Sequence, residues 1–223
     1  MRINSSIPVP ATVLVLMALL LEGCAASRPR NPENLCEIFT ENRGWYLSAR
    51  GAARRWKGPI EVPMAIMYQE SGFRANVRPP RRHLFGFIPL ARPSSALGYA
   101  QAQTPAWKQY QKESGNGWAE RDDFDDAIDF MQWYIDKSRR LNGVAKSDAY
   151  RQYLNYHEGW TGYKRGSYRG KATLEQVARR VAERSKRYAE QYAGCRKRLD
   201  RGRLRRLLFG AIPSRGLEVA GST

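Results

Sequence analysis

The stretch that decides the fold runs from Val62 to Phe73 and reads Val-Pro-Met-Ala-Ile-Met-Tyr-Gln-Glu-Ser-Gly-Phe. Its apolar run from Met64 to Met67 predicts a hydrophobic helix. Gly72 is expected to end that helix, because glycine is common just past the last helical residue. Glu70 is therefore predicted to lie at the end of a hydrophobic helix.

A carboxyl group in that position has an unusual environment. Partial burial disfavours the carboxylate, so it raises the pKa of Glu70 and prepares the group to donate a proton near neutral pH. Ser71 offers a hydroxyl that can orient a neighbouring group. A Glu-Ser pair before glycine is by itself usually just a helix end, so the interpretation depends on companion motifs.

Two further motifs follow along the chain, Gly98-Tyr99-Ala100-Gln101 and Asn155-Tyr156-His157-Glu158-Gly159. Gly98 allows a close approach of backbones, and the Gln101 amide can bind sugar hydroxyl or acetamido groups. Tyr156 offers a phenol and a flat face for a sugar ring. Further candidate stacking surfaces are Trp107, Trp118 and Trp160.

Together and in this order, the motifs resemble those of the soluble lytic transglycosylase family, whose catalytic domain has a goose-type-lysozyme-like fold. The family pattern is Glu-Ser-x-Phe, then Gly-Leu-Met-Gln, then Ala-Tyr-Asn-x-Gly. The resemblance spans about residues 62–163, roughly half of the chain. The sequence departs from the pattern at Tyr99-Ala100, which replace Leu-Met, and at His157, which replaces Asn.

The resemblance implies cleavage of peptidoglycan glycan strands. Glu70 would protonate the oxygen between N-acetylmuramic acid and N-acetylglucosamine, and would then assist the muramoyl C6 hydroxyl in attacking its own anomeric carbon, which yields a 1,6-anhydro sugar. Tyr156 would support Glu70, and Gln101 would position the sugar. No cofactor is implied, and two histidines without clustered thiols argue against a metal site. The implied substrate-binding residues are Ser71, Gly98, Tyr99, Gln101 and Tyr156.

Other functions stay open. Glu158 could serve as a second carboxylate and make the protein a lysozyme-type muramidase, although it follows Tyr156 by two residues and should point elsewhere. A non-catalytic peptidoglycan-binding lipoprotein would use the same cleft, but it has no chemical need for an acid at Glu70. A protein that binds nucleic acid or lipid through a basic surface is a third possibility, against which the missing nucleic-acid motifs count.

The first residues predict export. Arg2 precedes a nearly apolar run over residues 7–21, which suits a signal-peptide core and is short for a membrane span of about 20 residues. The sequence Leu21-Glu22-Gly23-Cys24 resembles a lipobox, which implies that Cys24 carries diacylglycerol and becomes the mature N-terminus. Ala25 after it implies anchoring at the periplasmic side of the outer membrane. An ordinary signal peptide with a chance cysteine is the alternative.

Charge and cysteine count add to this picture. The 223 residues include 38 Lys and Arg against 21 Asp and Glu, a formal net charge of +17, so the surface should attract anions. Export argues against nucleic acid as a partner. The remaining expected partners are the glycan strands of peptidoglycan and the membrane, which the protein would contact through its N-terminal lipid. Once Cys24 is lipidated, Cys36 and Cys195 form an even pair and predict a disulfide. Two free buried thiols are the alternative.

Periodicity predicts a mostly α, compact single domain, and the resemblance adds a lysozyme-like fold with a glycan-binding cleft. We expect a signal peptide at 1–23, a lipidated tether at 24–33, a catalytic domain at 34–198 and a basic flexible tail at 199–223, with a membrane-surface helix as the tail's alternative. Residues 78–95 read as a long loop, with an insertion at 84–90 near the cleft. Helices are expected from Thr104-Pro105, over about Asp123–Leu141, after a Ser147 cap, and from the capping box at Thr173.

Overall fold

Seven helices and one short hairpin make up the part of the chain that the structure describes. This computed structural model describes residues 28–81, 83–84, 88–89 and 91–209. The predicted signal peptide and the lipid site at Cys24 lie outside these residues. The helical content confirms the predicted mostly α class. The elements are α2 (Leu35–Glu41), α3 (Arg43–Trp56), α4 (Glu61–Ser71), β1 (His83–Leu84), β2 (Ile88–Pro89), α5 (Thr104–Ser114), α6 (Phe124–Asn142), α7 (Ala149–Lys164) and α8 (Ala172–Phe209).

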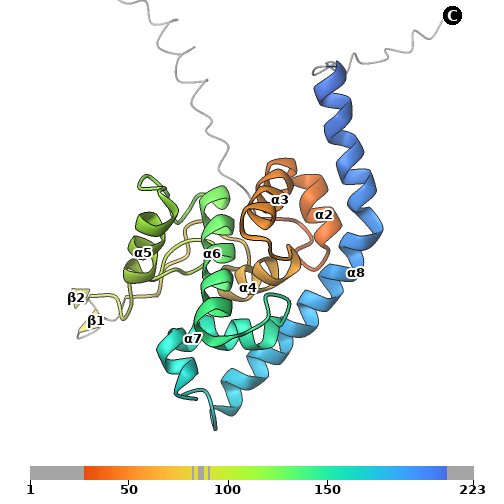
Figure 1. The fold of residues 1–223 in the computed structure, drawn as a ribbon. Coiled ribbons are helices and arrows are strands. Elements are labelled where there is room, and N and C mark those ends of the chain that lie inside the picture. Colours follow the sequence, from red (N-terminus) through yellow and green to blue (C-terminus); the bar gives the residue numbers. More distant parts are fainter. Residues whose placement is uncertain (1–27, 82, 85–87, 90, 210–223) are drawn as a thin grey trace, which may run out of the picture.

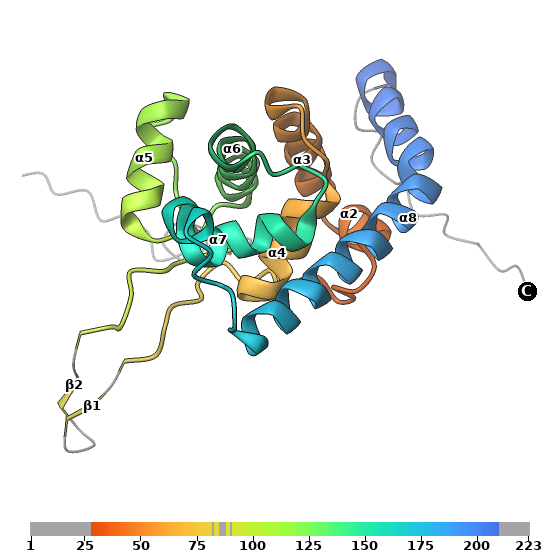
Figure 2. The same ribbon diagram turned by 60° about the horizontal axis from the view of Figure 1, so that its bottom comes forward.

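Helix α4 lies in the middle of the domain and packs against α6, α7 and α8 (Figures 1 and 2). Every residue from Val62 to Met67 is buried. A helix that is apolar on all sides removes its surface from water only when other elements enclose it. The neighbouring helices enclose α4 here. The hydrophobic run of α4 therefore places the end of this helix, with Glu70, inside the packed body.

Glycine ends several of the helices. Gly72, Gly115 and Gly143 follow α4, α5 and α6 in the left-handed conformation, with φ of 60°, 75° and 68°. A residue without Cβ adopts this conformation at little cost. The predicted helix ends at Gly72 and Gly143 are confirmed. Helix α3 differs, because Lys57 takes that place with φ 49°.

Three predicted helix starts are off by one or two residues. Asp148 rather than Ser147 caps α7, because its carboxylate accepts a hydrogen bond from the backbone N–H of Arg151 at 3.0 Å. Thr104 is the first residue of α5 rather than its cap, and Gln103 takes the cap position. Helix α8 begins at Ala172, so Thr173 already lies inside it. Neighbouring residues with a hydroxyl or a carboxylate can each cap a helix, and the sequence alone does not decide which of them takes the cap position.

Residues 78–95 are not a plain loop. Strands β1 and β2 pair antiparallel within it, with Leu84 opposite Ile88. The hairpin projects away from the helical body (Figure 2). Each strand has two residues, which is too short for an alternating pattern, and Pro89 is a residue tolerated only at sheet edges. Residues 85–87 and 90 of the predicted insertion lie outside the described residues.

The chain ends of the domain are longer than predicted. Helix α8 continues to Phe209, where a flexible tail from residue 199 was expected, and it extends past the body (Figure 1). The Leu199 side chain is 4% exposed, and the phenol of Tyr46 donates to Asp200 at 2.6 Å. At the other end, Glu33 of the predicted tether pairs with Arg184 at 2.7 Å. Tertiary contacts therefore hold Leu199, Asp200 and Glu33 against the rest of the domain.

The two ends are also linked covalently. Cys36 on α2 and Cys195 on α8 form a disulfide, with their Cα atoms 6.0 Å apart and a sequence separation of 159 residues. Closing a loop of this size restricts the unfolded chain and contributes about 2–4 kcal/mol in typical cases. Within the described segments, no helix has the length and apolar character that a membrane span requires.

Candidate active site

Glu70 lies in the last turn of α4 and keeps only partial exposure. Protein atoms surround its carboxyl group, and this burial raises its pKa to about 7. A hydrogen bond with the phenol of Tyr153 acts in the opposite direction and lowers that pKa. Near neutral pH a large fraction of Glu70 is therefore protonated, as a proton donor requires.

Tyr153, rather than Tyr156, is the tyrosine whose hydrogen bond lowers the pKa of Glu70. The phenol of Tyr156 donates instead to the backbone carbonyl of Ala100. The carboxyl of Glu70 still acts on Tyr156 through its charge. The predicted supporting role of Tyr156 is thus indirect, and Tyr153 was missed. Tyr153 precedes Tyr156 by one helical turn, so the i, i+3 spacing was the available signal.

Replacing Tyr153 with Phe is expected to shift the pH dependence of activity. The Tyr153 hydrogen bond favours the charged form of Glu70, so its removal raises the pKa of the acid further. Glu70 then stays protonated to higher pH, and the fall of activity on the alkaline side moves to higher pH. The measurement is the initial rate of glycan cleavage as a function of pH, for the parent protein and for the Tyr153→Phe variant. An unchanged or acid-shifted profile would contradict the assigned contact.

The three sequence motifs meet at the loop over residues 98–101. The hydroxyl of Ser71 donates to the Tyr99 carbonyl at 2.7 Å. The amide nitrogen of Gln101 donates to the carbonyls of Val77 and Gly98 at 2.8 and 2.9 Å. With the bond from Tyr156 to Ala100, side chains from all three motifs hold the loop beside the end of α4. The structure thus brings the three motifs together at this loop.

Several predicted substrate-binding side chains have structural roles instead. Tyr99 is 1% exposed, and its ring packs edge-on against Trp45 and Phe124. Ser71 is 2% exposed, and its hydroxyl is used on the backbone. Neither side chain can reach a sugar in this arrangement, which corrects the prediction for both. Tyr99-Ala100 in place of Leu-Met places an aromatic residue in the core.

Gly98 is required by close backbone packing. A Cβ atom built on it would lie 1.8 Å from the backbone oxygen of Arg121, and its φ is +79°. No larger residue fits this space without moving the loop. The close backbone approach predicted for Gly98 is therefore made to the protein itself.

A pocket of about 390 Å³ is lined by Gln101 and Tyr156, from the second and third motifs. Trp160 forms part of its wall, stacked on Tyr134 with 4.4 Å between ring centroids. Aromatic faces with a few polar groups are the usual lining of a sugar site. Glu70 does not line the pocket, but Tyr156 does and connects the two. The lining also includes Gln103, Gln109, His157 and Glu158.

The other two tryptophans proposed as stacking surfaces lie elsewhere. Trp107 is 5% exposed, and its indole N–H donates to the carbonyl of Ala119 at 3.2 Å. Trp118 is 95% exposed in the segment between α5 and α6, and it does not line the pocket. Of the three, Trp160 alone is placed to contact a ligand in this pocket.

Backbone strain flanks the site. Phe73 and Gln101 are non-glycine residues with φ of 61° and 51°. Such conformations cost of order 1–3 kcal/mol each and are found where the surroundings fix them. Phe73 is fully buried against Trp45 and Tyr68. One strained residue, Phe73, lies three positions after Glu70, and the other, Gln101, lies in the 98–101 loop.

Glu158 is held in an ion pair with Lys171. Lys171 donates to it at 2.8 and 2.9 Å, the hydroxyl of Ser167 also donates to it, and the His157 ring nitrogen lies 3.0 Å away. These partners cover the carboxylate. Their hydrogen bonds, with that of Lys171 as the largest contribution, lower the pKa of Glu158 to about 2. Glu158 therefore stays ionised at neutral pH, and its contacts join the segment before α8 to α7.

The fold and the site together define a helical domain with a protonatable carboxyl, Glu70, and an aromatic pocket, and Tyr156 links the two. A sequence profile of the transglycosylase SLT domain family matches residues 12–195, which is most of the chain, so the protein belongs to that family. The helical arrangement agrees with the lysozyme-like fold expected for it. No curated protein and no solved structure matches the chain.

Proposed function

We propose that this protein is a peptidoglycan lytic transglycosylase that cleaves the β-1,4 bond between N-acetylmuramic acid and N-acetylglucosamine and leaves a 1,6-anhydro-muramoyl end. The observation that carries the proposal is a single carboxyl with a pKa of about 7, at the end of the buried helix α4. Membership of the family supports the substrate class.

In the first step, protonated Glu70 transfers its proton to the bridging oxygen, and the bond from that oxygen to the anomeric carbon breaks. Positive charge develops on the sugar ring as the leaving group departs. Glu70 becomes a carboxylate, which Tyr153 stabilises by its hydrogen bond. The pocket lined by Gln101, Tyr156 and Trp160 is the proposed place for adjoining sugar.

In the second step, the Glu70 carboxylate takes the proton of the C6 hydroxyl, whose oxygen bonds to the anomeric carbon. Glu70 ends protonated, and no water is consumed. A hydrolase with the usual chemistry needs a second carboxylate as nucleophile or base. Glu158 is engaged by Lys171 and Ser167, whereas an internal hydroxyl nucleophile makes a lone Glu70 sufficient.

Digestion of purified peptidoglycan, with products identified by mass spectrometry, tests the reaction. We expect anhydro-muropeptides from the parent protein and also from a Glu158→Gln variant, with a rate within about tenfold of the parent, since that carboxylate takes no part in proton transfer. Reducing-end products would overturn the proposal in favour of a muramidase. Bound glycan without any product would favour a non-catalytic binding protein.

We also propose that the protein is a lipoprotein, anchored through Cys24 at the periplasmic side of the outer membrane. The support is the Leu21-Glu22-Gly23-Cys24 sequence after an apolar run. Globomycin, which blocks processing of lipidated precursors, should make the unprocessed form accumulate in cells. Normal processing in its presence, or in a Cys24→Ser variant, would instead indicate an ordinary signal peptide.

A further inference from the structure

A second pocket lies at the opposite end of α4 from Glu70. It has a volume of about 670 Å³ and lies between the end of α3, the last turns of α6 and the segment before α7. Pro59, one of its lining residues, lies two residues before α4 begins at Glu61. The nine helical steps from Glu61 to Glu70 place the two ends of α4 roughly 14 Å apart. The pocket is therefore separate from the proposed catalytic site.

The lining carries excess positive charge. It includes four cationic side chains, those of Arg55, Lys57, Arg139 and Lys146, but one carboxylate, that of Asp136. Lys146 pairs with Asp136 at 2.6 Å, and Arg55 pairs with Asp129 at 3.0 Å. Arg140 also pairs with Asp136 at 2.9 Å. Neither Lys57 nor Arg139 forms an ion pair with another described residue. These two cations of the pocket are therefore available to an anion.

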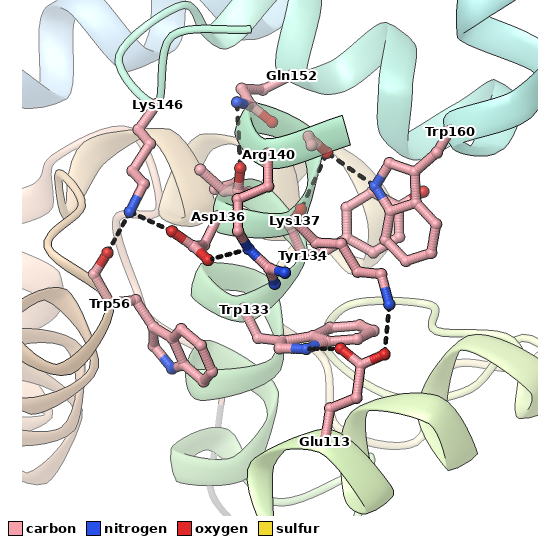
Figure 3. A network of polar contacts seen from close by, with 12 residues as sticks. Trp56, Glu113, Trp133, Tyr134, Asp136, Lys137, Arg140, Lys146, Gln152 and Trp160 are labelled. Atoms are coloured by element: carbon pink, nitrogen blue, oxygen red, sulfur yellow. Dashed lines mark hydrogen bonds and ion pairs between the residues drawn. The ribbon is translucent and has the colours of Figure 1, made fainter. Parts of the chain in front are cut away.

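The base of the pocket is fixed before any ligand arrives. Lys146 bridges the Trp56 carbonyl and the Asp136 carboxylate, which also accepts from Arg140 (Figure 3). The Trp56 indole N–H donates to Asp129 at 2.8 Å, which fixes the ring in the wall. An aromatic wall adds a surface for the uncharged part of a ligand.

Lys57 supplies an independent indication. It ends α3 in the left-handed conformation, with φ 49°, where glycine ends α4, α5 and α6. Among the residues that the structure describes, the other two non-glycine residues with positive φ, Phe73 and Gln101, both flank the site of Glu70. A lysine at this strained position gives no advantage to the helix end over glycine. Its side chain is exposed at the rim of the pocket, where a function in binding would explain it.

We propose that this pocket is an oxyanion-binding site, which takes a carboxylate or phosphate group between the Lys57 ammonium and the Arg139 guanidinium. Arg139 offers paired N–H donors that match two oxygens of such a group, and Lys57 offers a mobile point charge. The uncharged part of the ligand lies against Trp56. Two sources of this chemistry are free phosphate and the carboxylates of peptidoglycan stem peptides.

Titrations followed by the Trp56 indole N–H resonance in ¹⁵N-labelled protein test the site. The probes are inorganic phosphate, stem peptide released from peptidoglycan, and the same peptide with its carboxyls amidated, all at constant ionic strength. We expect a saturable shift with at least one of the first two probes and none with the amidated peptide. A shift with phosphate alone would assign the site to free phosphate, and one with the peptide to wall carboxylates.

A Lys57→Gly, Arg139→Gln variant should bind the same probe at least about tenfold more weakly, since each lost contact is a charge-assisted hydrogen bond. Its melting temperature should not fall because of Lys57→Gly, since glycine relieves the left-handed residue. A Lys108→Gln, Lys186→Gln variant removes the same charge from exposed positions on α5 and α8 and should bind like the parent. Glu70→Gln should also bind normally, which separates this site from the proposed catalysis.

No saturable shift with either phosphate or stem peptide would overturn the proposal. Equal weakening in the two double variants would also overturn it, because the effect would then follow net charge rather than this pocket. An equal response to the amidated peptide would exclude recognition of an oxyanion.

Discussion

Replacing Glu70 with Gln is expected to lower the rate of anhydro-muropeptide release from peptidoglycan by at least about 10³-fold, as for loss of an efficient general acid. Gln keeps the shape of the side chain but cannot donate a proton to the bridging oxygen. Burial disfavours the charged form of Glu70, so the neutral amide should not destabilise the fold. Rates are measured by chromatography and mass spectrometry of products, and folding by thermal denaturation.

Glu61→Gln provides the matched control, because Glu61 lies in the first turn of the same helix. That variant should retain the parental rate. The parental enzyme should also lose activity as pH rises through about 7, the pKa of Glu70, because the acid must be protonated at the start of each turnover. Retained cleavage in the Glu70→Gln variant would remove Glu70 from the catalytic role.

Replacing Gly98 with Ala is expected to destabilise the protein by at least about 3 kcal/mol and to reduce activity strongly. The new Cβ would lie 1.8 Å from the Arg121 backbone oxygen, and backbone atoms cannot move aside as a flexible side chain can. The loop that carries Gln101 and accepts from Tyr156 would have to shift. Urea denaturation and the rate of product release measure the two effects.

Gly115→Ala separates the steric clash from the backbone effect. Gly115 has a φ of +75°, close to the +79° of Gly98, but nothing lies within 4 Å of its Cβ position. This variant should lose only about 1 kcal/mol, the usual cost of the left-handed conformation. Equal losses in the two variants would show that the contact with Arg121 is not responsible.

Local sequence determined where α4 and α6 end and where Glu70 lies along the chain. Gly72 and Gly143 end their helices as predicted, because the left-handed conformation depends on the residue itself. The apolar run of α4 required enclosure on all sides, which placed Glu70 inside the body and raised its pKa. These features follow from short-range chemistry and from burial, which a sequence records directly.

The tertiary structure alone decided which side chains meet. Tyr153 and Tyr156 lie one turn apart, yet Tyr153 bonds to Glu70 and Tyr156 to the Ala100 carbonyl. Ser71 and Tyr99 turn into the core rather than toward a ligand. The pocket that includes Lys57 also appears only when α3, α6 and the segment before α7 come together. The direction of a side chain depends on the packing of distant segments, and a one-dimensional pattern does not contain it.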